Sequence, residues 1–185
     1  MKKILTIFTA IIAVVITLTA CSGESKISPD SIELDNAYRF VADIRYGEGF
    51  SAAGQFERKS TSVWEITLTE PFALTGKTLK YEQGNITAQF EGLENNNISG
   101  DLHSFAPYKR IIDVFEHAIS GDGRTVVSSG ERITISSRAG TPSMAYELVL
   151  DKSTLSPLTL TIADASITVE FSDVQMSQIV SVILP

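Results

Sequence analysis

The chain has 185 residues, of which 43% are hydrophobic and 20% charged, as expected for one ordinary globular domain with a short appendage. Its formal net charge is −7 and its basic residues are not clustered, which excludes the electrostatic signature of a nucleic-acid-binding protein. One cysteine and two histidines exclude a disulfide framework and a multi-cysteine metal site, so we expect neither a metal nor a cofactor.

The first twenty residues have the pattern of a secretory signal peptide. Lys2 and Lys3 form a short positive end, the apolar stretch 4–18 follows, and small residues precede Cys21. The tetrad that ends at Cys21, Leu-Thr-Ala-Cys, resembles the bacterial lipobox, in which the thiol is acylated and the chain is cut just before it. An uncleaved transmembrane anchor is the alternative, but such a helix normally needs about 20 apolar residues.

Lipidation at Cys21 predicts where the protein resides. Two acyl chains, such as palmitate, anchor a protein stably because each buried CH₂ contributes about 0.8 kcal/mol. We therefore expect residues 1–20 to be removed and the mature protein to be held by Cys21 on the extracytoplasmic face of the bacterial cell membrane, as a lipoprotein of the cell envelope. Residues 21–36 are polar and lack a sustained period, which predicts a tether, and residues 37–185 form the domain.

The domain is dominated by residues that alternate between apolar and polar. This period of two predicts strands, and the roughly nine to eleven candidates are spaced as in a barrel or a sandwich. An antiparallel sheet with one buried face requires this alternation. The clearest candidate strands are Tyr38–Tyr46, Phe50–Phe56, Trp64–Leu68, Leu79–Tyr81, Ile86–Phe90, Ile133–Ile135, Met144–Leu150, Leu158–Ile162 and Ile167–Phe171.

One segment, Pro107–Ser120, has helical periodicity instead. Its apolar residues recur at helical spacing, Pro107 suits a first turn and Gly121 suits a stop. The predicted fold class is therefore mainly β (α+β): a curved antiparallel half-barrel sheet covered by one or more helices. A flat two-sheet sandwich is the alternative.

No constellation of catalytic residues is visible, so we do not expect an enzyme. Asp113 and His117 are one helical turn apart, but an ordinary exposed pair explains that spacing. Gly47–Gly54 superficially resembles a phosphate-binding loop, yet an amphipathic strand follows it rather than a helix, so we expect a hairpin turn.

A family resemblance rests on the C-terminal part of the domain. The segment 150–158 (Leu-Asp-Lys-Ser-Thr-Leu-Ser-Pro-Leu), followed by an apolar strand and a closing strand that ends Phe171-Ser-Asp173, resembles the LolA/LolB-type lipoprotein-carrier superfamily. The hairpin strands Tyr38–Tyr46 and Phe50–Arg58 fit the same arrangement. The resemblance implies a LolA-like half-barrel with helices over its open side and an apolar concave surface. Some relatives use that surface to carry acyl chains, and others act through protein partners.

Two functions follow as expectations. The first is binding of a lipid or another long apolar ligand in the concave face of the sheet; the alternative is a non-catalytic scaffold that docks an envelope enzyme or receptor protein. Partners would be the membrane through Cys21, an acyl-chain ligand or an envelope protein. The candidate ligand lining is Phe40, Ile44, Phe56, Trp64, Ile66, Leu68, Phe90, Met144, Tyr146 and Leu148.

Overall fold

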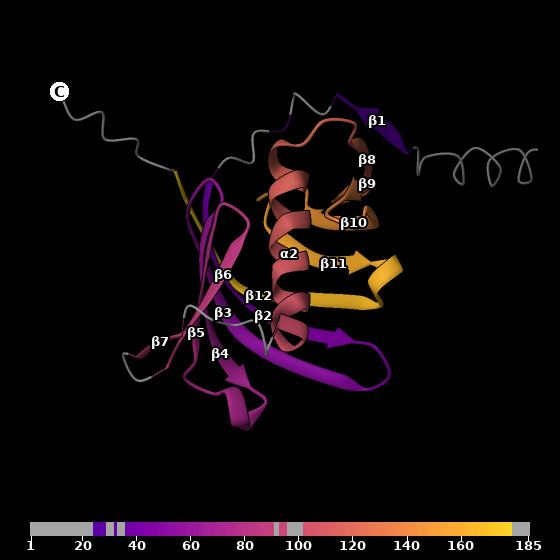
Figure 1. Ribbon diagram of the computed structural model, residues 1–185. Coiled ribbons are helices and arrows are strands. Elements are labelled where there is room, and N and C mark those ends of the chain that lie inside the picture. Colours follow the sequence, from indigo (N-terminus) through magenta and orange to yellow (C-terminus); the bar gives the residue numbers. More distant parts are fainter. Residues whose placement is uncertain (1–23, 29–31, 33–35, 91–92, 96–101, 179–185) are drawn as a thin grey trace, which may run out of the picture.

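The structure is a computed structural model that describes residues 24–28, 32, 36–90, 93–95 and 102–178, so the predicted signal peptide and Cys21 lie outside the described residues. Within these ranges the chain forms a long helix, short 3-10 turns and twelve strands (Figure 1). In chain order the elements are β1 (Ser25–Ile27), β2 (Asn36–Tyr46), β3 (Phe50–Ser60), β4 (Val63–Glu70), η2 (Phe72–Leu74), β5 (Thr78–Glu82), β6 (Asn85–Phe90), β7 (Leu93–Asn95), α2 (Leu102–Ser120), β8 (Thr125–Ser129), β9 (Arg132–Ala139), β10 (Met144–Asp151), β11 (Pro157–Ile162), η4 (Ala163–Ala165) and β12 (Ile167–Gln178).

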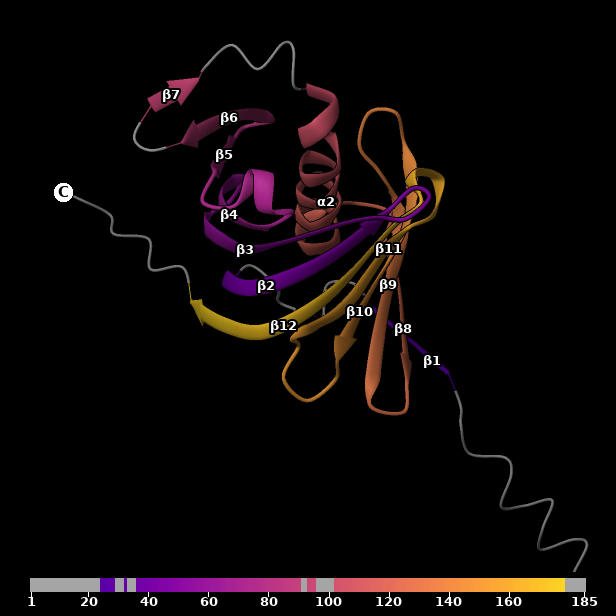
Figure 2. The same cartoon turned by 90° about the horizontal axis from the view of Figure 1, so that it is seen from below.

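The strands form one antiparallel sheet in the order β1-β8-β9-β10-β11-β12-β2-β3-β4-β5-β6-β7. Two runs of consecutive strands, β2–β7 and β8–β12, are joined where β12 pairs with β2. Figure 2 shows that the sheet curves around α2, which lies on its concave side. This arrangement confirms the predicted half-barrel covered by a helix and excludes the flat two-sheet sandwich.

Alternation along β2 and β3 places apolar side chains on the concave side. Phe40 is opposite Phe56, and Ala42 is opposite Gly54, in a regular antiparallel register. A Cβ atom at position 54 would lie 3.0 Å from the carbonyl oxygen of Thr67 on β4. Glycine at this position therefore lets β3 and β4 approach closely within the curved sheet.

Helix α2 begins earlier than predicted. It starts at Leu102, so Pro107 lies inside the helix, and the prediction that Pro107 opens it is wrong. The proline withholds one backbone hydrogen bond early in the helix, and burial of the following apolar stripe outweighs that loss. The C-terminal end is as predicted: the Gly121 amide donates to the carbonyl of His117, and the Arg124 guanidinium donates to the carbonyls of Ala118 and Ile119.

The segment predicted to be a tether contains a strand. Residues of β1 pair with β8, with Ser25 opposite Ser128 and Ile27 opposite Val126. Ile32 also packs against the hydrophobic core. Part of the polar N-terminal segment is thus attached to the edge of the sheet, beside β8.

The turn between β10 and β11 carries the motif on which the family resemblance rests. One carboxylate oxygen of Asp151 accepts hydrogen bonds from the backbone amides and hydroxyls of Ser153 and Thr154. These bonds, the Ser153 hydroxyl first, lower the pKa of Asp151 to about 2. The Asp-Lys-Ser-Thr sequence therefore forms a turn stabilised by its own side chains.

Candidate functional site

The predicted ligand lining forms the centre of the hydrophobic core. Nine of its ten side chains are at most 4% exposed and belong to one cluster with the apolar face of α2. The side chain of the tenth, Phe90, lies outside the described part of the chain. The nine buried residues therefore pack within the core that α2 completes, and a role in ligand binding stays a prediction. They are Phe40, Ile44, Phe56, Trp64, Ile66, Leu68, Met144, Tyr146 and Leu148.

Aromatic rings form the densest part of this core. The ring of Phe40 on β2 lies 5.6 Å from the ring of Phe115 on α2 and 5.6 Å from that of Phe56 on β3. Trp64 packs edge-on against Phe115 at a centroid distance of 5.4 Å. Such pairs add about 0.5–1.5 kcal/mol each beyond the area that they bury, so they hold α2 firmly on the sheet.

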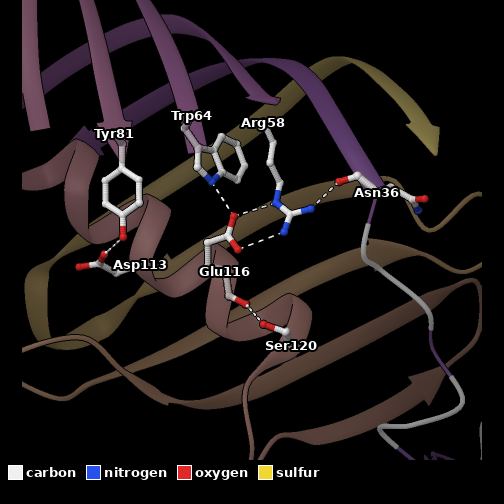
Figure 3. Close-up of polar contacts among 7 residues, drawn as sticks. All are labelled: Asn36, Arg58, Trp64, Tyr81, Asp113, Glu116 and Ser120. Carbon is white, nitrogen blue, oxygen red and sulfur yellow. Dashed lines mark hydrogen bonds and ion pairs between the residues drawn. The ribbon is translucent and has the colours of Figure 1, made fainter. Parts of the chain in front are cut away.

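A buried ion pair, Arg58–Glu116, links α2 to the sheet within this core (Figure 3). The guanidinium of Arg58 on β3 donates to both carboxylate oxygens of Glu116 on α2, at 2.7 and 3.1 Å. The indole N–H of Trp64 donates to the same carboxylate at 2.7 Å. Because a third donor bond of Arg58 goes to the carbonyl of Asn36, the two charges are well partnered.

The sequence analysis did not predict this pair, although the residue patterns of β3 and α2 both indicate it. Arg58 follows Phe56 at the next inward position of β3, and Glu116 lies between the buried positions Phe115 and Ala118 of α2. A single charge on each of two apolar faces that must pack together predicts a salt bridge, because an unpaired buried charge is costly.

Asp113 and His117, expected to form an exposed pair, bind other partners instead. Asp113 accepts a hydrogen bond from the hydroxyl of Tyr81 at 2.7 Å and one from Lys109 at 2.6 Å. Burial, and then the Asp113 hydrogen bond, raises the pKa of Tyr81. His117 instead bonds to the hydroxyl of Tyr146 at 2.9 Å, so these two helix positions form separate contacts with the two halves of the sheet.

A cleft of about 530 Å³ lies beside the first half of α2. It is bounded by the β5–β6 turn and the start of β6 on one side, and by the β9–β10 turn on the other. Of the nine described side chains of the predicted lining, Met144 alone contributes to it. The residues around the cleft are Gly84, Asn85, Ile86, Thr87, Phe105, Ala106, Lys109, Arg110, Asp113, Thr141 and Met144.

The cleft combines apolar and polar walls. Phe105 and Met144 are both 4% exposed and connect it to the core, whereas Lys109, Arg110 and Asp113 bring charges to it. Because the curvature of the sheet brings β6 and the β9–β10 turn to the same helix, three segments far apart in the sequence meet here. Sites for small molecules have this composition, in which an apolar surface binds and a few polar groups orient the ligand.

Within the described part of the chain, no group of three or more His, Cys, Asp and Glu side chains could hold a metal ion. No helix within the described ranges is both long and apolar enough to cross a membrane.

No family model and no curated protein matches the chain. Among solved structures, it is similar to an uncharacterized conserved protein from Thermus thermophilus, with a TM-score of 0.42 and 8% identity over 79% of this chain and 82% of that one. It is also similar to a DUF1329 family protein from Desulfovibrio piger (TM-score 0.40, 9% identity, 85% of this chain and 90% of that one). A LolA superfamily protein from Nitrosomonas europaea matches at a TM-score of 0.36 and 10% identity, over 85% of this chain and 91% of that one. The superfamily that the sequence resembles is thus represented among these structures.

Proposed function

We propose that the protein is an extracytoplasmic bacterial lipoprotein, anchored to the cell membrane through Cys21, whose half-barrel domain binds a lipid or another long apolar ligand. The sequence of the first twenty-one residues supports the anchor, and the cleft beside α2 supports the ligand. The observation that carries the proposal is the volume of about 530 Å³ next to Phe105 and Met144, because small-molecule sites typically measure roughly 300–1,000 Å³.

We place the proposed site at the edge of α2 rather than in the concave face of the sheet. Core residues such as Trp64 and Leu68 are at most 1% exposed, so a ligand could reach them only if α2 moved. The cleft needs no such movement. A chain of a dozen CH₂ groups gains roughly 10 kcal/mol on burial at about 0.8 kcal/mol each, before the costs of association and ordering.

Native mass spectrometry tests ligand binding. The protein lacking residues 1–20 and carrying Cys21→Ser contains every described residue. It is purified without detergent and then titrated with fatty acids and phospholipids. We expect a lipid to copurify or to bind on titration, and Ile86→Glu to abolish binding because Ile86 lines the cleft. Phe72→Glu is the matched control, since Phe72 is 95% exposed and lies outside the cleft.

The outcome also decides between the two candidate functions. If neither the bare protein nor any added lipid gives a complex, binding of an apolar ligand is refuted. The filled concave face favours the second candidate, a non-catalytic scaffold that docks an envelope enzyme or receptor. If no lipid binds in the titration, this second function becomes the better supported one.

Metabolic labelling with a fatty-acid probe tests the anchor. We expect label on the native protein, release of residues 1–20, and no label on the Cys21→Ala variant. Equal labelling of both proteins would refute acylation at Cys21.

A further inference from the structure

We propose that the ligand of the cleft is an anionic amphiphile, whose head group binds Arg110 and whose chain lies on the apolar wall. This inference rests on the proposed function and specifies the class of ligand. It starts from the three charged side chains of the cleft, Lys109, Arg110 and Asp113, all carried by α2.

The carboxylate that lines the cleft, Asp113, is already engaged. One of its oxygens accepts from Tyr81 at 2.7 Å, and the other accepts from Lys109 at 2.6 Å. The ammonium of Lys109 also lies 5.8 Å from the centre of the Tyr81 ring. Lys109 and Asp113 therefore neutralise one another within a local network.

Arg110 lies outside that network. It is half-buried at the cleft, and within the described ranges no carboxylate or carbonyl forms a hydrogen bond or an ion pair with it. The described walls of the cleft thus carry one uncompensated positive charge, in a chain whose formal net charge is −7. A planar guanidinium can bind two oxygens of a carboxylate or phosphate at once, and this is the strongest kind of protein hydrogen bonding.

The other walls fit a molecule with two chemically different ends. Ile86, Phe105 and Met144 offer an apolar surface, and methionine adapts well to a flexible chain. Asn85, Thr87 and Thr141 add groups that can donate hydrogen bonds near the charges. A cationic amphiphile finds no free carboxylate among the described residues of the cleft, and a neutral one leaves Arg110 without a counter-charge.

The test compares ligands that share a twelve-carbon chain and differ in head group. Binding of dodecyl phosphate, dodecanol and dodecyltrimethylammonium is measured by calorimetry, below the concentrations at which they form micelles, with the protein lacking residues 1–20 and carrying Cys21→Ser. We expect dodecyl phosphate to bind about tenfold more tightly than dodecanol, as one charge-assisted hydrogen-bond pair allows, and the cation to bind most weakly. The preference should weaken as salt is added.

Two arginine variants test whether Arg110 causes the preference for dodecyl phosphate over dodecanol. Arg110→Gln should reduce the affinity for dodecyl phosphate to that for dodecanol. Arg132→Gln, which removes the same charge from an exposed position on β9 outside the cleft, should leave the preference intact.

The remaining outcomes overturn the inference. If dodecanol and dodecyl phosphate bind equally to the native protein, or if Arg110→Gln keeps the preference, an anionic head group is refuted while the proposed function stands. If inorganic phosphate alone binds as tightly as dodecyl phosphate, the site takes a free anion and no amphiphile. If no twelve-carbon ligand binds, the inference fails, and the titration with fatty acids and phospholipids described above decides whether the proposed function fails with it.

Discussion

Replacing Glu116 by glutamine tests whether the buried ion pair holds the folded domain together. The substitution keeps the size of the side chain and an oxygen that can accept from Trp64, but it removes the negative charge. The side chain of Arg58 is 0% exposed, so its guanidinium loses the Glu116 carboxylate at a place where water cannot replace it. Breaking a buried pair in this way costs about 3–5 kcal/mol.

The lower end of that range is expected, because the carbonyl of Asn36 still accepts from Arg58 at 2.8 Å. For a domain of this size, 1 kcal/mol corresponds to roughly 2–4 °C in melting temperature. A loss of about 3 kcal/mol should therefore lower the melting temperature by roughly 6–12 °C.

Urea unfolding followed by tryptophan fluorescence measures the effect directly. Trp64 is the only tryptophan of the chain, and its indole donates to Glu116, so the probe lies within the perturbed site. The matched control is Glu170→Gln, which breaks the exposed pair with Arg45 and should change the free energy of unfolding by less than about 1 kcal/mol.

The double variant Arg58→Met with Glu116→Gln separates the effect of the ion pair on the free energy of unfolding from the effect of side-chain packing. Because it buries no charge, it should be more stable than Glu116→Gln alone. A Glu116→Gln variant that loses no more stability than the Glu170→Gln control would refute the reasoning.

Three further predictions concern tyrosine, histidine and aspartate side chains. Within the described part of the chain, the buried hydroxyl of Tyr108 has no hydrogen-bond partner, so Tyr108→Phe should keep or raise the free energy of unfolding. Tyr81→Phe should lower it by about 1 kcal/mol, because the Tyr81 hydroxyl donates to Asp113. Urea titration of the two variants measures both effects. Burial lowers the pKa of His117 below its ordinary value of 6.5, so near this pH the unfolded chain binds more protons than the folded one. The free energy of unfolding should therefore fall as the pH drops below 6.5. His117→Gln should reduce this loss, as measured by unfolding at about pH 7.5 and pH 5.5. The pKa of Asp151 should be about 2 in an NMR titration of the carboxyl carbons, and a value near 3.8 would contradict the hydrogen-bonded turn.

The fold was largely predictable because long strands alternate clearly. Tyr38 to Ile44 on β2 and Met144 to Leu150 on β10 put every second side chain into the core, and period two is a strong signal over such lengths. The strands that escaped prediction are short. In β1 and β8 three to five residues with serine and lysine among them form strands because a neighbouring edge is available, which local sequence does not show.

The candidate site was much less predictable than the fold. Its walls come from residues 84–87, 105–113 and 141–144, which meet only because the sheet curves around α2. Alternation gives the face of each side chain but not the curvature of the sheet, so it could not distinguish core positions such as Leu68 from cleft positions such as Ile86. The sequence likewise does not single out Arg110, because nothing in it shows that the nearby carboxylate of Asp113 is engaged elsewhere.

If Cys21 is acylated as proposed, the pairing of β1 with β8 would hold the β8–β9 end of the sheet near the bilayer. Three residues lie between Cys21 and Ser25, so the four residue steps span at most about 14 Å. Ser25 lies opposite Ser128, beside the β8–β9 turn, while the cleft includes residues of the β9–β10 turn at the other end of β9 (Figure 2). The anchored end and the cleft would then lie at opposite ends of β9, so we expect ligand to reach the cleft from the aqueous side or from another protein rather than from the lipids beneath the anchor.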